Sequence, residues 1–319
     1  MTRTGVVLTA FGGPDCIDAV EPFMCSIMGR QPSAEAVSEA RERYEAIGGG
    51  SPLPAMAARI ADSLERDLSS GGDVPVAVGM LHSHPTIASA VDALVEAGVE
   101  RVISLSLSPF DAAATTGAYS EALVAAASTH PGLVVTAAAG YNRSDPFVTA
   151  LAQQARAILG GWALADTLVV FTAHSLPVAD LEADPAYVVQ LRETAEAVAV
   201  ATGLGLADGF SALPGVEAFG GHGGSVPWLL AFQSKGRRGG AWAGPDLDAI
   251  IAAAAASGLR GVVILPIGFA ADHMETLYDL DVVAAQHAVS LGLGFARAMA
   301  PNDSEKMIEA LADSVRAAI

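Results

Sequence analysis

The fold is decided by a stretch near the middle of the chain, residues 167–177, which read TLVVFTA and then His174-Ser-Leu-Pro177. A continuous apolar and β-branched run that stops at a turn is typical of a strand buried on both faces. The same pattern opens the chain, where residues 5–11 read GVVLTAF and run into Gly12-Gly-Pro14. We therefore expect two buried strands of the same kind, one at the start of each half.

Short apolar runs alternate with longer stretches of helical periodicity after both strands. Strands separated by helices of this length predict βαβ units and a parallel sheet. The sequence thus predicts two similar α/β domains joined near residues 140–146, with a ligand in the cleft between them. In the first half we expect further strands at residues 74–78, 102–107 and 133–136, and helices at 34–46, 54–67, 86–96 and 117–127. In the second half we expect strands at 228–233, 261–267 and 294–298, and helices at 187–201, 247–256, 275–290 and 304–318.

Composition excludes several classes of protein. The 319 residues include 17 Lys and Arg against 35 Asp and Glu, which gives a net charge of −18. Such a chain lacks the basic stripe that nucleic acids or anionic lipids require. Its apolar runs are far shorter than the roughly 18 residues of a membrane span, and the first residues do not read as a signal peptide. Two cysteines, Cys16 and Cys25, are too few for a disulfide framework or a four-cysteine cluster. We expect a cytoplasmic protein.

An acidic segment follows the predicted strand at 261–267. Asp272, Glu275 and Asp279 would lie at i, i+3 and i+7 of a helix that begins there, on one face. Such a row of oxygens can bind a divalent cation and pass it on. The alternative is that Asp272 caps the helix while the other carboxylates favour its positive end. The position at a strand exit favours the functional interpretation.

Histidines offer a proton acceptor. His174 sits in a turn at the carboxyl edge of a predicted sheet, and an imidazole titrates in the range that proton transfer needs. His82 and His84 have the spacing of a strand-borne chelate, but hydrogen bonding is the preferred interpretation. No phosphate-binding loop ending in lysine and no nucleophile elbow occur, and we interpret residues 220–224 (GGHGG) as a flexible loop.

Several sequence pieces, taken in order, resemble the ferrochelatase family, which inserts ferrous iron into a porphyrin late in haem synthesis. The resemblance covers nearly the whole chain, and the histidine turn together with the Asp-His-x-Glu-Thr-Leu-Tyr segment is its specific part. The pieces are Phe11-Gly-Gly-Pro14, Arg43-Tyr-Glu-Ala-Ile-Gly-Gly49 with Ser51-Pro-Leu53, Thr115-Thr-Gly-Ala-Tyr119, Thr172-Ala-His-Ser-Leu-Pro177, Ala231-Phe-Gln-Ser234 with Trp242-Ala-Gly-Pro-Asp246, and residues 266–281 (PIGFAADHMETLYDLD).

The resemblance implies a fold and a site. It implies two Rossmann-like domains, residues 1–143 and 144–319, each with a four-stranded parallel sheet flanked by helices, the porphyrin between them and residues 12–55 covering it. The last helix would pack back on the structure. His174 and Glu275 would be catalytic, and the metal would meet His174, Glu275, Asp279 and Asp272. The porphyrin would contact Phe11, Arg30, Arg43, Ser51, Tyr119 and Trp242.

The same resemblance implies the reaction partners. These are a porphyrin and Fe²⁺ as substrate, with no organic cofactor, no iron–sulfur cluster and transient contact with other haem-pathway enzymes. Phe11 and Val283 depart from the family pattern, which keeps open a haem carrier without chelatase activity or a chelatase for another metal. Coproporphyrin III and protoporphyrin IX both remain substrates, with coproporphyrin mildly favoured. Its four propionates would draw on Arg30, Arg41, Arg43, Lys235, Arg237 and Arg238.

Overall fold

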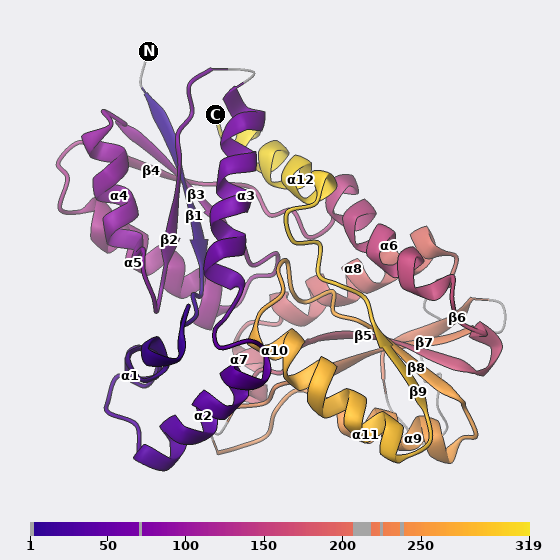
Figure 1. Cartoon of the computed structure of the whole chain (residues 1–319). Helices are drawn as coiled ribbons and strands as arrows, with labels where there is room; N and C mark the ends of the chain where they lie inside the picture. Colours follow the sequence, from indigo (N-terminus) through magenta and orange to yellow (C-terminus); the bar gives the residue numbers. More distant parts are fainter. Residues whose placement is uncertain (1–2, 70–71, 207–217, 224–225, 237–238) are drawn as a thin grey trace. The chain divides into compact units, whose positions relative to one another are not determined.

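The computed structural model describes residues 3–69, 72–206, 218–223, 226–236 and 239–319. It divides into two compact units, each built on its own sheet (Figure 1). The first unit comprises Met1–Tyr141, Ala271–Met274 and Asn302–Ile319, and the second comprises Asn142–Ala270 and Glu275–Pro301. The two-sheet α/β architecture expected from the sequence is confirmed. In the described part of the chain, no helix is long and apolar enough to cross a membrane.

The first unit contains a four-stranded parallel sheet in the order β2-β1-β3-β4. Its central strand β1 is almost wholly buried, as its continuous apolar sequence predicts. Helices α4 and α5 cover one face and α3 packs on the other (Figure 1). The strands are β1 (Thr4–Ala10), β2 (Val76–Met80), β3 (Arg101–Ser106) and β4 (Val134–Ala137). The helices are α1 (Val20–Met28), α2 (Ala34–Ala46), α3 (Leu53–Leu68), α4 (Ile87–Glu96) and α5 (Ala118–Ala127).

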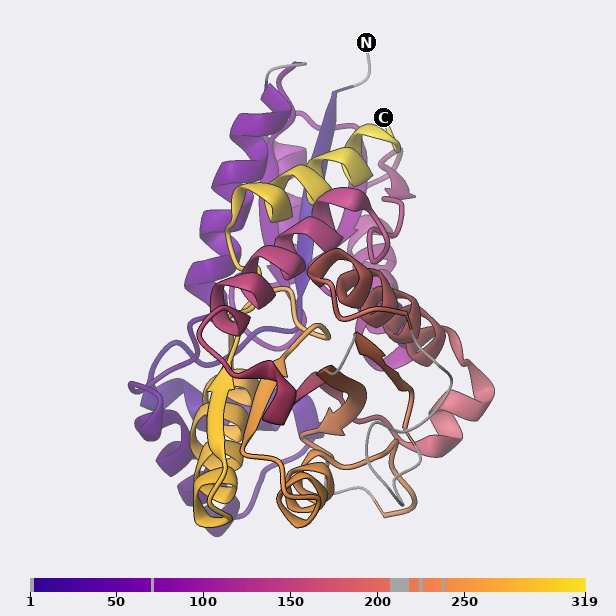
Figure 2. The ribbon, with the colours of Figure 1, turned by 90° about the vertical axis from the view of Figure 1, so that its right-hand side faces the viewer.

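The final helix, α12 (Glu305–Arg316), belongs to the first unit, whereas the sequence assigned it to the second domain. It packs against α3 and also contacts β3 (Figures 1 and 2). Its buried stripe includes Met307, Leu311 and Val315, and Arg316 is paired with Asp67 of α3. Helical periodicity predicts this apolar stripe, but it does not reveal which sheet the stripe covers.

The second unit contains a five-stranded sheet in the order β6-β7-β5-β8-β9. Helix α9, a π-helical segment (Asp279–Ala284) and α11 pack on one face, where they bury Leu280, Ala284 and Ala288. Helices α6 and α8 pack against each other, and α6 contacts β8. The strands are β5 (Thr167–His174), β6 (Gly220–Gly223), β7 (Val226–Gln233), β8 (Gly261–Leu265) and β9 (Gly294–Arg297). The helices are α6 (Asp145–Leu159), α7 (Val178–Ala183), α8 (Ala186–Thr202), α9 (Leu247–Ala256), α10 (Met274–Leu277) and α11 (Ala285–Ser290).

The fifth strand corrects the sequence prediction of four parallel strands in this sheet. Gly220–Gly223, interpreted as part of a flexible loop, forms β6 and pairs antiparallel with β7. Glycine is needed at position 220 because a Cβ there would lie 2.2 Å from the carbonyl oxygen of Trp228. Glycine in a strand often marks such a close backbone approach. Gly224 lies outside the described residues.

Candidate active site

His174 is the last residue of β5 and lies opposite Gln233 of β7 at the carboxyl edge of the second sheet. The turn that follows is held from several sides. The Ser175 amide donates to the Gln233 carbonyl at 2.7 Å, and the Ser175 hydroxyl donates to the Ala243 carbonyl at 2.8 Å. The 2 % exposed Ser175 therefore ties the histidine turn to the loop that carries Trp242.

The His174 ring is oriented by its backbone neighbours. Its Nδ1 contacts the Ser175 carbonyl, which can only accept a hydrogen bond, so Nδ1 carries a proton. Its Nε2 lies 3.3 Å from Oε1 of Glu275, and both side chains are 30 % exposed. The buried Tyr187 of α8 donates its hydroxyl to the His174 carbonyl at 2.9 Å. Nε2 is thus the ring atom directed at the carboxylate.

Glu275 controls the charge of this pair. Burial acts to lower the pKa of His174, but the Glu275 carboxylate, with a smaller contribution from Asp279, raises the pKa to about 9. Burial and Glu275 also raise the pKa of Tyr187 well above its ordinary value, so its phenol remains a donor. At neutral pH His174 is therefore an imidazolium beside the Glu275 carboxylate.

The acidic segment lies over the ends of β5 and β7. Glu275 is in α10, and its backbone carbonyl accepts a bond from the Gln233 amide at 2.8 Å. Asp279 starts the π-helical segment, and its carboxylate accepts a hydrogen bond from the Ser234 hydroxyl. The predicted i, i+3, i+7 row assumed a regular α-helix, and the π-helical turn breaks that regularity.

Asp272, the fourth predicted metal ligand, has a hydrogen-bond partner within the protein, and its role toward a metal stays a prediction. It belongs to the first unit, is 6 % exposed, and exchanges hydrogen bonds with Asn302. Within the residues that the structure describes, no group of three or more His, Cys, Asp or Glu side chains is arranged to hold a metal ion. The site thus offers a histidine–carboxylate pair with a second carboxylate one helical turn further on, and no preformed cage.

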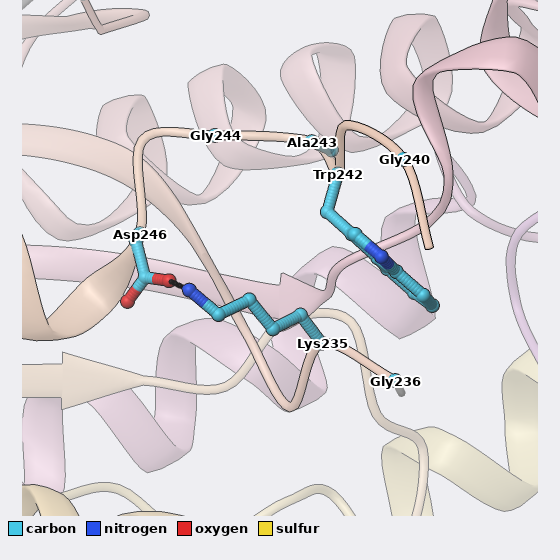
Figure 3. Close-up of a pocket in the computed structure, with 7 residues that line it drawn as sticks. All are labelled: Lys235, Gly236, Gly240, Trp242, Ala243, Gly244 and Asp246. Atoms are coloured by element: carbon cyan, nitrogen blue, oxygen red, sulfur yellow. Dashed lines mark hydrogen bonds and ion pairs between the residues drawn. The ribbon is translucent and has the colours of Figure 1, made fainter. Parts of the chain in front are cut away.

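Trp242 lines a pocket of about 540 Å³ in the second unit (Figure 3). The other lining residues are Lys235, Gly236, Gly240, Ala243, Gly244 and Asp246. The Lys235 ammonium is 2.5 Å from a carboxylate oxygen of Asp246, and the indole ring lies so close to Gly236 that a Cβ there would be 2.7 Å from it. The pocket thus presents an aromatic face beside a cation. Arg237 and Arg238 lie outside the described residues.

The other predicted porphyrin residues belong to the first unit. Phe11 packs against the core cluster that contains Tyr119. The Ser51 amide donates to the Pro14 carbonyl at 2.7 Å, which places Ser51 beside the Gly12-Gly-Pro14 turn. Arg30 is exposed at the end of α1, and Arg43 is half-buried in the last turn of α2. The structure therefore brings Phe11 and Ser51 to the turn after β1, and Tyr119 belongs to the core cluster against which Phe11 packs.

Several residues that build the site have no role predicted from the sequence. Gln233 and Ser234 lie at the end of the buried strand β7, and that position was the available signal. Tyr187 lies in the first turn of α8 (Ala186–Thr202). The sequence of that helix does not indicate that the Tyr187 hydroxyl binds the His174 carbonyl.

Two solved structures share the fold of this chain. Bacillus subtilis SirB with Fe³⁺ matches with a TM-score of 0.58 at 13 % identity, covering 99 % of this chain and 95 % of that one. The sirohydrochlorin chelatase SirB from Bacillus subtilis subspecies spizizenii, with cobalt, matches with a TM-score of 0.54 at 14 % identity, covering 99 % and 94 %. The fold is that of the two-domain chelatases.

The sequence comparison gives the family. The sequence model of the ferrochelatase family matches residues 3–319, so the chain belongs to that family. It is 30 % identical to the ferrochelatase of Deinococcus radiodurans, over 98 % of this chain and 94 % of that protein. It is 32 % identical to the coproporphyrin III ferrochelatase of Propionibacterium freudenreichii, over 100 % and 88 %. The protein is a porphyrin metal chelatase that inserts Fe²⁺ into a porphyrin in haem biosynthesis.

Proposed function

We propose that His174 and Glu275 are the catalytic pair that takes the pyrrole protons during iron insertion. The reaction exchanges two N–H protons of the porphyrin for one Fe²⁺, so it needs two proton acceptors near the same nitrogens. The observation that carries the proposal is the 3.3 Å approach of His174 Nε2 to Glu275 Oε1 at the carboxyl edge of the sheet. An imidazole and a carboxylate in such contact can each accept one proton.

The charge of the His174–Glu275 pair supports a proton release that depends on the arrival of iron. Glu275 keeps His174 protonated at neutral pH because it raises the pKa of the imidazole to about 9. An arriving divalent cation repels the imidazolium proton and competes for the carboxylate. His174 then releases its proton to water and becomes a base. Proton acceptance is thereby linked to the presence of the metal.

Metal delivery is assigned to Asp279, Glu275 and His174. Asp279 follows Glu275 by four residues, and its carboxylate is oriented by the Ser234 hydroxyl. Oxygen ligands followed by an imidazole suit a weakly held Fe²⁺ that must leave its protein ligands for the porphyrin. The absence of a preformed cage among the described residues agrees with a metal that is passed on.

Porphyrin binding is assigned to an apolar set and a polar set. Phe11, Tyr119 and Trp242 would contact the macrocycle, because flat rings gain dispersion and stacking from aromatic neighbours. Arg30, Arg43 and Ser51 would bind propionates, since arginine forks match carboxylate geometry. Lys235 in the Trp242 pocket adds an ammonium that could exchange Asp246 for a propionate (Figure 3).

We further propose coproporphyrin III as the preferred porphyrin. The support is the Propionibacterium freudenreichii relative, named for that substrate, which matches over the full length of this chain. Side-by-side anaerobic assays with coproporphyrin III and protoporphyrin IX would measure kcat/KM for each from the metalloporphyrin absorbance bands. We expect the higher value for coproporphyrin III, and a higher value for protoporphyrin IX would contradict the assignment.

Replacing Glu275 tests the catalytic pair. Glu275→Gln keeps the shape but loses the charge, and we expect kcat for Fe²⁺ insertion to fall by about 10²-fold or more. The dissociation constant for porphyrin, measured by fluorescence quenching, should change little. Glu182→Gln, an exposed acid on α7, is the matched control and should keep wild-type kcat. Equal losses of turnover and porphyrin affinity in Glu275→Gln would refute the catalytic role.

We also propose that the protein needs no organic cofactor and no iron–sulfur cluster, acts in the cytoplasm, and contacts other haem-pathway enzymes transiently. The chain has two cysteines, too few for a four-cysteine cluster. Iron and acid-labile sulfide analysis of the purified protein tests the cluster, because stoichiometric sulfide would contradict the proposal. Cell fractionation tests the location, and crosslinking in cells tests the enzyme contacts.

A further inference from the structure

The acidic segment, residues 275–284, is held on the second sheet by side chains from two different strands. Gln233 and Ser234, at the end of β7, bind the Glu275 carbonyl and the Asp279 carboxylate within the site already described. Arg297, the last residue of β9, binds the Asp281 carboxylate. In the sheet, β9 lies on the opposite side of the central strand β5 from β7. The role of this third attachment is not explained by the reaction chemistry.

The Arg297–Asp281 pair has the geometry of a rigid clamp. Nε and Nη2 of Arg297 donate to the two oxygens of Asp281, both at 2.7 Å. The Arg297 side chain is 7 % exposed, and β9 pairs with β8 with Arg297 opposite Ile264. A planar guanidinium bound to both carboxylate oxygens fixes direction as well as distance. Asp281 is therefore held at one position relative to the sheet.

The clamp acts on the segment whose helical geometry is unusual. The Val283 amide donates to the Tyr278 carbonyl at 3.0 Å, an i→i+5 bond, within a π-helical turn that spans Asp279–Ala284. Such turns are rare and often occur at functional sites. Relaxation to α-helical geometry shifts the register by one residue, which corresponds to a rotation of about 100°. That rotation would turn Asp279 away from Ser234.

We propose that Arg297 is a positioning residue for iron insertion: by clamping Asp281 it fixes the π-helical register that keeps Asp279 at Ser234 and Glu275 at His174. The inference rests on the proposed roles of Glu275 and Asp279. Asp281 is 39 % exposed, so water alone would solvate its charge. Its bond to the nearly buried Arg297 is therefore not needed for solvation, and its effect is to restrain the segment.

The test compares metal kinetics with porphyrin kinetics in Arg297→Gln. Because the acidic residues meet the metal, we expect kcat/KM for Fe²⁺ to fall about tenfold, as displaced catalytic groups lose rate steeply. KM for porphyrin should stay near the wild-type value. Arg297→Lys keeps the charge and loses the fork, so it should recover only part of the loss. Hydrogen exchange at the amides of residues 279–284 should accelerate in both variants.

A core truncation serves as the control for stability alone. Val263→Ala opens a cavity on the opposite face of the same sheet from the cluster that buries Leu280 and Ala284, so it lowers the unfolding temperature but should leave both KM values unchanged. If Arg297→Gln fails to fold, Asp281→Asn weakens the clamp from its exposed side and should give the same selective loss toward the metal. Assays run well below the unfolding temperature of each variant.

The outcomes separate this proposal from the proposed function. Wild-type metal kinetics in Arg297→Gln, or equal changes in the metal and porphyrin parameters, would overturn the positioning role. A Glu275→Gln enzyme with wild-type turnover would instead overturn the catalytic pair on which the inference rests. Loss of turnover in Glu275→Gln together with a metal-selective loss in Arg297→Gln would support both.

Discussion

Two histidines at the carboxyl ends of parallel strands have opposite electrostatic environments. His174 ends β5 and faces Glu275, which raises the pKa of the imidazole to about 9. His82 follows β2, where Nδ1 lies 3.0 Å from the Ser26 hydroxyl and the ring centre lies 4.7 Å from that of Phe11. Burial lowers the pKa of His82. The surroundings of His174 favour the charged imidazolium, whereas burial in an aromatic cluster favours the neutral form of His82.

The difference shows that position at a strand end does not by itself determine the charge of a histidine. Both residues occupy the sheet edge where α/β proteins bind ligands. A carboxylate across from the ring, supplied by a segment about a hundred residues further along the chain, distinguishes His174. His82 instead forms edge-on contacts with Phe11 and Phe23, which suits a wall that packs against an apolar substrate.

Replacing each histidine by alanine gives the largest contrast. His174→Ala removes the proposed proton acceptor, and we expect kcat for Fe²⁺ insertion to fall by about 10²–10⁴-fold. His82→Ala removes ring packing and should chiefly cost about 1 kcal/mol of unfolding free energy. Anaerobic turnover and denaturant unfolding of both variants measure the contrast. Near-wild-type turnover in His174→Ala, with an unchanged free energy of unfolding, would contradict the proposed difference in role between His174 and His82.

Titration of the two imidazoles by NMR sharpens the comparison. Glu275→Gln removes the charge that favours the imidazolium, so we expect the pKa of His174 to fall from about 9 to its ordinary range or below, where burial dominates. The pKa of His82 should not move, because no carboxylate contributes to it. A high pKa of His174 that persists in Glu275→Gln would show that another group sets it.

Unfolding free energy should depend on pH in opposite senses at the two sites. The folded pKa of His174 is raised, so its contribution is complete below the unfolded value of 6.5 and disappears as the pH rises through about 9. The free energy of unfolding of wild type should exceed that of Glu275→Gln at low pH. This difference should shrink between pH 6.5 and pH 9 by on the order of 2 kcal/mol, after allowance for solvent screening. The folded pKa of His82 is lowered, so its contribution disappears as the pH falls below 6.5. A difference that stays constant from pH 6 to pH 9.5 would contradict the linkage at His174.

The sequence predicted those strands, turns and helices that depend on neighbouring residues. Continuous apolar runs identified β1 and β5, and the turn after β5 identified His174, because burial and turn chemistry are written in adjacent residues. Helices Ala34–Ala46 and Leu247–Ala256 begin and end where periodicity and a capping residue predict. Glu275 was identified because acidic residues cluster after a strand exit.

Features that depend on contacts with other segments of the chain could not be predicted in this way. The sequence does not show that Asp272, a predicted metal ligand, exchanges hydrogen bonds with Asn302. The glycine-rich β6 resembled a loop because its strand geometry comes from pairing with β7. The π-helical turn has no sequence period of its own, and Arg297 is recognised only once its two bonds to Asp281 are known. In each case the outcome depends on contacts with another segment of the chain.

The first unit is not continuous in the sequence, and this affects how the protein folds during synthesis. Asn302–Ile319 completes it, and α12 covers the apolar side of α3 with residues such as Leu311 and Val315. Domains generally fold as units, N-terminal first, as the ribosome releases the chain. Here the earliest part to emerge must wait for α12, with Ile60 and Leu64 on the buried stripe of α3. Full assembly of the first unit therefore requires a segment made more than 160 residues after Tyr141, and chains lacking α12 are expected to aggregate.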